Sequence, residues 1–289
     1  MTTESELGAF TQGSTGADSR QRVHAQIGEL GLEGNVADLE ASGYTVVEDA
    51  APLELFDRIK RAIVDITDEV RSRGVKPYDF GPNTAMVYRL LCKDPVFAEA
   101  VLNPKLTALM SYLLGEAYVV SVTTGSTLNE GAQAGPLHAD NQFFPDPFPV
   151  QTQVATAIWC CDDFSEELGS THVVPGSHRL FRHPRRKEGL DQVVAVNAPR
   201  GAIVIWSGHT WHRSGARAAS GARIALHTAF ARPHVRTFES YSPDEIATLA
   251  TFDPRLPALV GDDSPFGYSG DGPDANKIIG LALRTQALA

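Results

Sequence analysis

The residues best suited to chemistry in this sequence are two histidines and an aspartate. One residue separates His138 from Asp140, so on a β-strand both side chains point to the same face and can reach one point. His212 lies on a second predicted strand and can complete the set. Two histidines and one carboxylate with open positions are typical of non-haem Fe(II) oxygenase sites. Hydrogen-bonded core histidines produce the same spacing, so the pattern alone leaves both interpretations open.

Ser214 and Arg223, which follow His212 in the sequence, strengthen the metal-site interpretation. Ser214 lies two residues further on, on the same face of the predicted strand, and Arg223 follows eleven residues after His212, at the start of the next strand. An arginine can bind a carboxylate through two parallel hydrogen bonds. Arg223 is therefore a candidate for holding an acid beside the metal, and a structural ion pair is the alternative.

Three longer segments carry sequence motifs around these residues. They are PLHAD at 136–140, LGSTHVVPGSH at 168–178, and GAIVIWSG at 201–208, which leads to His212. Together with the spacing to Arg223, these segments resemble the phytanoyl-CoA dioxygenase family of Fe(II)- and 2-oxoglutarate-dependent oxygenases. The resemblance spans roughly residues 43–232.

The resemblance implies a mainly β fold with flanking helices, a double-stranded β-helix, which is a jelly roll of the cupin type. It implies Fe(II) bound by His138, Asp140 and His212, with 2-oxoglutarate and O2 as co-substrates. Arg223 would hold the distal carboxylate of 2-oxoglutarate, helped by the hydroxyls of Thr171 and Ser214. The carboxylate at Asp140 argues against halogenation, because related halogenases have a small residue there.

The sequence departs from the family pattern in two places. Many members have a glutamine three residues before the first histidine, where this chain has Gly135. Either Gln133 takes over that contact with the co-substrate or the contact is missing. The loop 215–221 also lacks the asparagine that many members place there.

Candidate substrate residues follow the predicted metal ligand Asp140 directly. Aromatic side chains at the mouth of a barrel can pack an apolar substrate, and amides can orient it. His227 shares strand parity with Arg223, so both are expected on the same face. The alternative is that the aromatic residues close the end of the sandwich as core. Besides His227, the candidates are Asn141, Gln142, Phe143 and Phe144.

The pattern of the chain changes from helical to β near residue 118. Apolar spacing, N-cap residues and terminating glycines predict helices first, with one short strand at 44–48, and β-branched runs between Gly and Pro predict strands later. The expected helices are 35–43, with Asn35 as N-cap, 52–73, 95–102, 104–114, and one beginning at Ser242. The expected jelly-roll strands are 118–128, 136–140, 152–162, 171–175, 192–197, 202–206, 210–214 and 223–231.

These elements predict one oxygenase domain at 23–289 after a flexible N-terminal tail at 1–22. Within it, we expect a helical part at 23–117, the jelly-roll core at 118–232, and a C-terminal helix and loop segment at 233–289. The Gly/Pro/Asp-rich stretch 261–274 is interpreted as a loop or lid.

Composition excludes several function classes. A hydrophobic content of 43% over 289 residues is ample for a core, and no apolar run approaches the roughly 20 residues of a membrane span. A net charge of −10 argues against nucleic-acid binding. Three cysteines and a polar start predict a reducing cytoplasm rather than secretion. The expected partner is a small molecule, and the chain is expected to be a monomer or homodimer.

The resemblance implies oxidation of an unactivated C–H bond, with release of succinate and CO2. Hydroxylation of a small secondary metabolite is the first interpretation. Hydroxylation of an acyl-CoA or a fatty-acid-like molecule is the second, although the negative charge gives no support for a polyanionic CoA ester. A non-catalytic cupin-like binding protein and a zinc hydrolase are further alternatives, and a hydrolase would have no use for Arg223.

Overall fold

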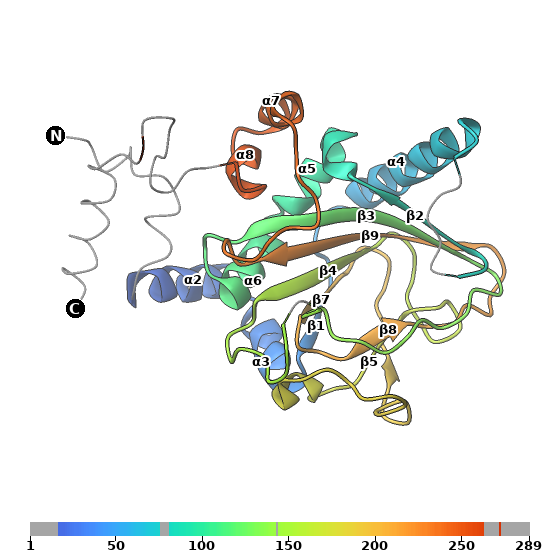
Figure 1. The fold of residues 1–289 in the computed structure, drawn as a ribbon, viewed down its shortest axis with the longest axis horizontal. Coiled ribbons are helices and arrows are strands. Elements are labelled where there is room, and N and C mark those ends of the chain that lie inside the picture. The colour runs from blue at the N-terminus through green and yellow to red at the C-terminus, as the bar shows by residue number, and fades with distance from the viewer. Residues whose placement is uncertain (1–16, 76–80, 143, 263–271, 273–289) are drawn as a thin grey trace.

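The structure, a computed structural model, describes residues 17–75, 81–142, 144–262 and 272. Two antiparallel sheets form its centre (Figure 1). The larger sheet has the order β1 (Tyr44–Val47), β7 (Ile203–Ser207), β4 (Val154–Cys160), β9 (Ala222–Ala231), β3 (Val119–Asn129) and β2 (Thr84–Tyr88). The smaller sheet has the order β6 (Val194–Ala195), β5 (Thr171–Val173) and β8 (His212–Ser214). This arrangement confirms the predicted jelly roll.

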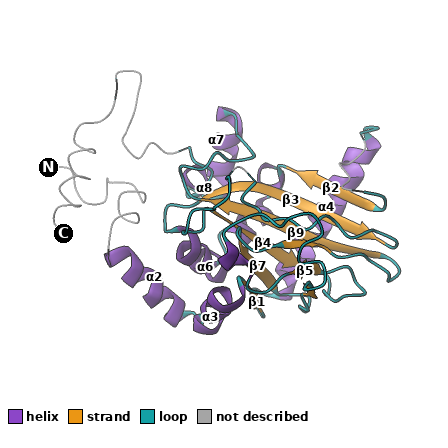
Figure 2. Cartoon of the chain, turned by 60° about the horizontal axis from the view of Figure 1, so that its bottom comes forward, coloured by secondary structure: helices purple, strands orange, loops and turns teal. Residues whose placement is uncertain are grey.

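Helices cover the face of the larger sheet that points away from the smaller one (Figures 1 and 2). They are α2 (Ala17–Glu29), α3 (Glu33–Ser42), α4 (Leu53–Ser72), α5 (Pro95–Val101), α6 (Pro104–Leu114), α7 (Pro243–Phe252) and α8 (Leu256–Leu259). Side chains cap two of the predicted helix starts, because Asp94 accepts from the N–H of Val96 and Asn103 from that of Leu106. In both helices a proline follows the cap, where its missing N–H has no cost.

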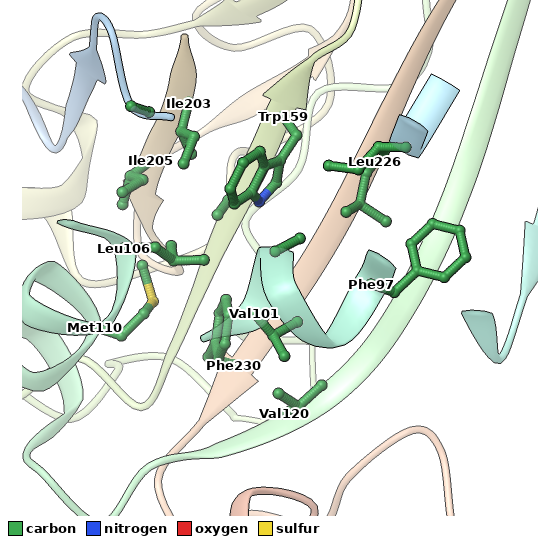
Figure 3. Packing of buried hydrophobic residues seen from close by; sticks show 14 of the residues in the cluster. Phe97, Val101, Leu106, Met110, Val120, Trp159, Ile203, Ile205, Leu226 and Phe230 are labelled. Carbon is green, nitrogen blue, oxygen red and sulfur yellow. The ribbon is translucent and has the colours of Figure 1, made fainter. Parts of the chain in front are cut away.

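Alternation along β9 separates the two sides of the larger sheet. Leu226 and Phe230 pack with Trp159 in the core under the helices (Figure 3). Ala225 belongs to a second core between the sheets, and Arg223 and His227 share its side of the strand. The predicted parity of Arg223 and His227 thus places both toward the smaller sheet.

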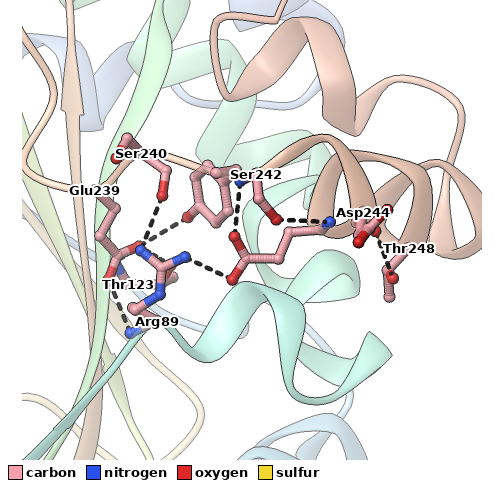
Figure 4. Close-up of polar contacts among 9 residues, drawn as sticks. Arg89, Thr123, Glu239, Ser240, Ser242, Asp244 and Thr248 are labelled. Carbon is pink, nitrogen blue, oxygen red and sulfur yellow. Dashed lines mark hydrogen bonds and ion pairs between the residues drawn. The ribbon is translucent and has the colours of Figure 1, made fainter.

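The C-terminal part is tied to the end of β2 by polar contacts (Figure 4). The Arg89 guanidinium donates to Glu245 Oε1 at 2.6 Å, and the backbone N–H of Arg89 donates to Glu239 Oε1 at 2.8 Å. Ser242 and Glu245 form a capping box at the start of α7, where the sequence predicts a helix. The helix is therefore anchored both to its own first turn and to the sheet.

Several expectations from the sequence were wrong. The segment 136–140 is not a strand, since its β pairing consists of a single bridge between His138 and His212. Helix α2 begins at Ala17, inside the expected flexible tail. Helix α3 begins at Glu33, and Asn35 instead donates to the Thr45 hydroxyl.

Other differences concern elements that the sequence pattern underestimated or missed. Strand β2 was not predicted, and the expected strand at 192–197 is reduced to the two residues of β6. Most of the predicted loop at 261–274 lies outside the described residues. Among the helices that the structure describes, none is long and apolar enough to cross a membrane.

Candidate metal centre

The structure brings His138, Asp140 and His212 together. The backbones of His138 and His212 exchange two N–H···O bonds of 3.0 and 2.8 Å, which places the two imidazoles side by side. Asp140 Oδ1 lies 3.6 Å from His138 Nε2 and 3.4 Å from His212 Nε2. One donor atom from each residue lies within 4.8 Å of the others, as a shared metal ion requires. The bridge, rather than a continuous strand, produces the geometry that the spacing predicted.

Hydrogen bonds behind the donor atoms orient all three side chains. Nδ1 of His138 lies 2.9 Å from the carbonyl of Pro136, and Nδ1 of His212 lies 3.0 Å from the carbonyl of Thr210. A carbonyl can only accept, so each Nδ1 carries the proton and each Nε2 presents its lone pair. Two donors from the larger sheet hold the other oxygen of Asp140, Oδ2, and leave Oδ1 for the metal. They are Thr156 Oγ1 at 2.7 Å and Trp206 Nε1 at 2.9 Å.

The electrostatics suit a metal ligand set. Burial opposes ionisation of Asp140, but the neighbouring His212 and His138 and its two hydrogen bonds outweigh burial and lower its pKa. Burial lowers the pKa of His212, which favours the neutral imidazole. An ionised carboxylate and neutral imidazoles are the forms that bind a divalent cation. The His138 side chain is 42% exposed, so this side of the cluster is open to solvent.

Arg223 is a buried cation that lacks a carboxylate partner among the described residues. Its residue exposure is 2%, and its guanidinium donates to the carbonyl of Gly169 at 2.7 Å and lies 4.3 Å from the ring centroid of Phe164. Within the described part of the chain, its Nε has no hydrogen-bond partner. Burial lowers the pKa of Arg223 to about 10. A buried charge without a counter-ion is costly, so these atoms fit an anion such as the distal carboxylate of 2-oxoglutarate.

The carboxylate that contributes to the electrostatics at Arg223 is already occupied. Asp162 contributes to the electrostatics at Arg223, but its Oδ1 pairs with Lys60 and its Oδ2 accepts from the backbone N–H of Ile224. The alternative of a structural ion pair for Arg223 therefore has no support within the described part of the chain.

The other predicted co-substrate residues divide into two groups. Thr171 on β5 and Ser214 on β8 lie opposite each other in the smaller sheet. Strand β8 also carries His212. Gln133 is exposed and bonds the carbonyl of Gly131, so the structure does not bring it into the site. Gly135 approaches Ser214 so closely that an added Cβ would lie 2.8 Å from its hydroxyl oxygen. The residue at position 135, where many family members have glutamine, thus lies close to the Ser214 hydroxyl. Gln133 does not take over the contact of the missing glutamine.

The predicted substrate residues lie in different environments. Asn141 is 1% exposed and neither of its amide atoms has a hydrogen-bond partner among the residues that the structure describes, whereas Gln142 is exposed. Phe144 packs against the buried cluster around Trp211, as in the alternative interpretation. Phe143 lies outside the described residues. His227 is partly buried, and its Nε2 lies 2.7 Å from the Ser126 hydroxyl.

Two residues of the centre were missed in the sequence. The apolar residues around Trp206 indicate a core residue, and its side chain is buried. Its indole N–H nevertheless donates a hydrogen bond to Asp140. Thr156 has the β-branched shape of an ordinary strand residue. No local signal distinguishes such partners, because their role depends on the pairing of Thr156 with Trp206 across β4 and β7.

Comparisons with known proteins agree with this geometry. A family model described as phytanoyl-CoA dioxygenase (PhyH) matches residues 39–225. "Dioxygenase af480" of Aspergillus fumigatus is 28% identical over 188 residues, covering 63% of this chain and only 60% of that relative. "Dioxygenase trt7" of Aspergillus terreus is 24% identical over 264 residues, covering 85% of this chain and 91% of that relative.

Solved structures share the fold at lower identity. The epimerase SnoN, crystallised with Fe3+, alpha ketoglutarate and nogalamycin RO, has a TM-score of 0.57 and 19% identity, covering 85% of this chain and 93% of its own. HygX from Streptomyces hygroscopicus, with nickel and 2-oxoglutarate bound, has a TM-score of 0.56 and 15% identity, covering 73% and 92%. The family match over most of the predicted span confirms the resemblance. This chain belongs to the phytanoyl-CoA dioxygenase family.

Proposed function

We propose that the chain is an Fe(II)- and 2-oxoglutarate-dependent dioxygenase that hydroxylates an unactivated C–H bond of a small secondary metabolite, releasing succinate and CO2. The observation that carries the proposal is the occurrence of two features on the side of the larger sheet that faces the smaller one. His138, Asp140 and His212 converge on one point, and Arg223 is a buried cation without a carboxylate partner. A metal ion and a dicarboxylate together satisfy both features.

Each residue then has a definite task. His138, Asp140 and His212 would hold Fe(II) on one face and leave its other positions open. With 2-oxoglutarate and O2, bound iron supplies the oxidising power for cleavage of a C–H bond. Arg223 would bind the distal carboxylate, helped by the hydroxyls of Thr171 and Ser214, which lie opposite each other on β5 and β8. No side chain needs to act as a general base, because the proposed chemistry removes a hydrogen atom.

Several observations support a natural product as substrate. Fungal relatives are named dioxygenases, and the structural neighbour SnoN was crystallised with nogalamycin RO. The net charge of −10 does not favour a CoA ester. The basic run at 182–187 is partly neutralised, because Arg182 forms an ion pair with Glu188 at 2.7 Å. An acyl-CoA or fatty-acid-like substrate is therefore the second candidate.

The test is release of succinate from 2-oxoglutarate under air, with Fe(II) and a substrate panel. Polycyclic polyketides and terpenoids are compared with fatty acyl-CoA esters, and mass spectrometry follows the gain of one oxygen atom. His212→Ala serves as the control without the metal site. We expect one succinate per oxidised polyketide or terpenoid molecule. Faster coupled turnover of acyl-CoA would support the second candidate, and a folded protein that binds neither Fe(II) nor 2-oxoglutarate would refute the proposal.

A further inference from the structure

His227 is a partly buried titratable residue for which the proposed chemistry has no task. It lies on β9 four residues after Arg223, on the same face of the strand and toward the smaller sheet. Burial first, and then the charges of Arg223 and His212, lower its pKa to about 3. The imidazole is therefore neutral at physiological pH and carries a single N–H. Ala225, two residues before His227 on the same face of β9, belongs to the core between the two sheets, so His227 faces the smaller sheet that carries His212.

The position of that single proton follows from the contacts of Ser126. The Ser126 hydroxyl oxygen lies 2.7 Å from Nε2 of His227, and its other acceptor, the carbonyl of Ala225, is 3.5 Å away. An O–H···O bond of 3.5 Å is too long to compete with a contact of 2.7 Å. Ser126 therefore donates to Nε2, and the proton of His227 lies on Nδ1.

The Nδ1–H group has no acceptor among the residues that the structure describes. His227 retains partial exposure although β9 is a central strand of the larger sheet, so the described residues do not enclose it completely. An N–H donor in such a place gains most from an acceptor that carries charge. A molecule that extends from Arg223 toward His212 on β8 would lie on the same side of the larger sheet as this donor.

We propose that Nδ1–H of His227 donates a hydrogen bond to the keto-acid end of 2-oxoglutarate, the end opposite to the carboxylate held by Arg223. The inference rests on the proposed function and deepens it. His227 would be a binding residue for the co-substrate, and Ser126 a positioning residue that keeps the proton on Nδ1. A neutral donor adds specificity for the keto acid without adding a second cation to the cavity.

The test compares three substitutions of His227 that differ in where they place a donor. Asparagine carries its amide nitrogen on Cγ, at the place of Nδ1, whereas glutamine carries it one bond further out, near the place of Nε2. Phenylalanine keeps the ring and removes both nitrogens. The dissociation constant of 2-oxoglutarate is measured by anaerobic titration of each Fe(II)-loaded protein, followed by the visible absorbance of the chelated keto acid. Fe(II) content and thermal unfolding verify that each variant is folded and loaded.

We expect His227→Phe and His227→Gln to weaken 2-oxoglutarate binding about tenfold or more, as loss of one hydrogen bond to a charged group does. His227→Asn should recover binding to within about threefold of the wild type. Ser126→Ala, which frees the tautomer, should weaken binding by a smaller factor than His227→Phe.

Wild-type affinity in His227→Phe, or equal losses in the asparagine and glutamine variants, would overturn the inference. These outcomes leave the proposed function intact if the wild type itself shows the absorbance band. Absence of the band in the wild type would instead refute the proposed function. The two failures are therefore distinguishable in the same titration.

Discussion

Replacing Thr156 with valine is the sharpest perturbation of the candidate metal centre that leaves all three ligands in place. The Thr156 hydroxyl donates to Oδ2 of Asp140 at 2.7 Å, and Trp206 is the second donor to the same oxygen, at 2.9 Å. Valine has nearly the same shape and suits the strand position between β7 and β9. The substitution therefore removes one hydrogen bond and leaves the packing almost unchanged.

The magnitude follows from the charge of the acceptor. A hydrogen bond to an ionised group contributes about 1.5–3 kcal/mol, and about 1.4 kcal/mol corresponds to a tenfold change in affinity. Loss of a partner of a metal ligand typically costs ten- to a hundredfold in metal binding. Because Trp206 still holds Oδ2 of Asp140, we expect Thr156→Val to weaken Fe(II) binding about tenfold, at the lower end of that range.

The assay is anaerobic calorimetric titration of metal-free protein with Fe(II), in competition with a chelator of known affinity. Thr156→Ser keeps the hydroxyl and is the matched control, with an expected affinity within about threefold of the wild type. Thermal unfolding of both variants verifies that the sheet is intact. Fe(II) affinity in Thr156→Val equal to that of the wild type would refute the claim that Oδ2 is held by the sheet so that Oδ1 can bind the metal.

Three further predictions concern other parts of the molecule. Arg223→Ala should weaken 2-oxoglutarate binding about a hundredfold, since it removes a buried charge partner, while Fe(II) content measured by elemental analysis stays unchanged. Burial lowers the pKa of His209 to about 4. Because His209 takes up a proton on unfolding, the free energy of unfolding should decrease as pH falls from about 6.5 toward 4. Denaturant titrations of His209→Leu should show a smaller dependence of this free energy on pH. Gly135→Ala should destabilise the fold by about 1 kcal/mol or less, because the Ser214 hydroxyl that it meets is at the end of an exposed side chain, and adding Ser214→Ala should recover most of the loss.

Each of these predictions has an outcome that contradicts it. Unchanged 2-oxoglutarate affinity in Arg223→Ala would show that Arg223 does not bind the distal carboxylate of 2-oxoglutarate. An identical pH slope in the wild type and His209→Leu would show that His209 is not held neutral in the folded state. If the Gly135→Ala protein and its double variant with Ser214→Ala unfold at the same denaturant concentration, the close approach does not limit residue 135.

One part of the site follows from strand periodicity. The parity of Arg223 and His227 on β9 is evident from the sequence, because successive side chains of a strand alternate between its faces. The capped helix starts at Asp94 and Asn103 are equally local, since each depends on one side chain and the proline that follows it. Such features need no knowledge of distant parts of the chain.

The remaining features depend on contacts between distant segments. The segment around His138 does not continue as a strand, and a single bridge to His212 sets its geometry. The role of Trp206 arises from its place beside Thr156 across two strands, and that of Gly135 from Ser214 on β8. Sequence periodicity predicts which face a side chain shares, but not which residue of another strand it meets.

The most direct test of the metal centre is an anaerobic titration of metal-free protein with Fe(II) and then with 2-oxoglutarate. If His138, Asp140 and His212 hold the metal and Arg223 holds the distal carboxylate of 2-oxoglutarate, a weak visible charge-transfer band should develop. The band should saturate as 2-oxoglutarate is added. His212→Ala should abolish it. A folded wild-type protein without the band, or a band of equal strength in His212→Ala, would contradict the account.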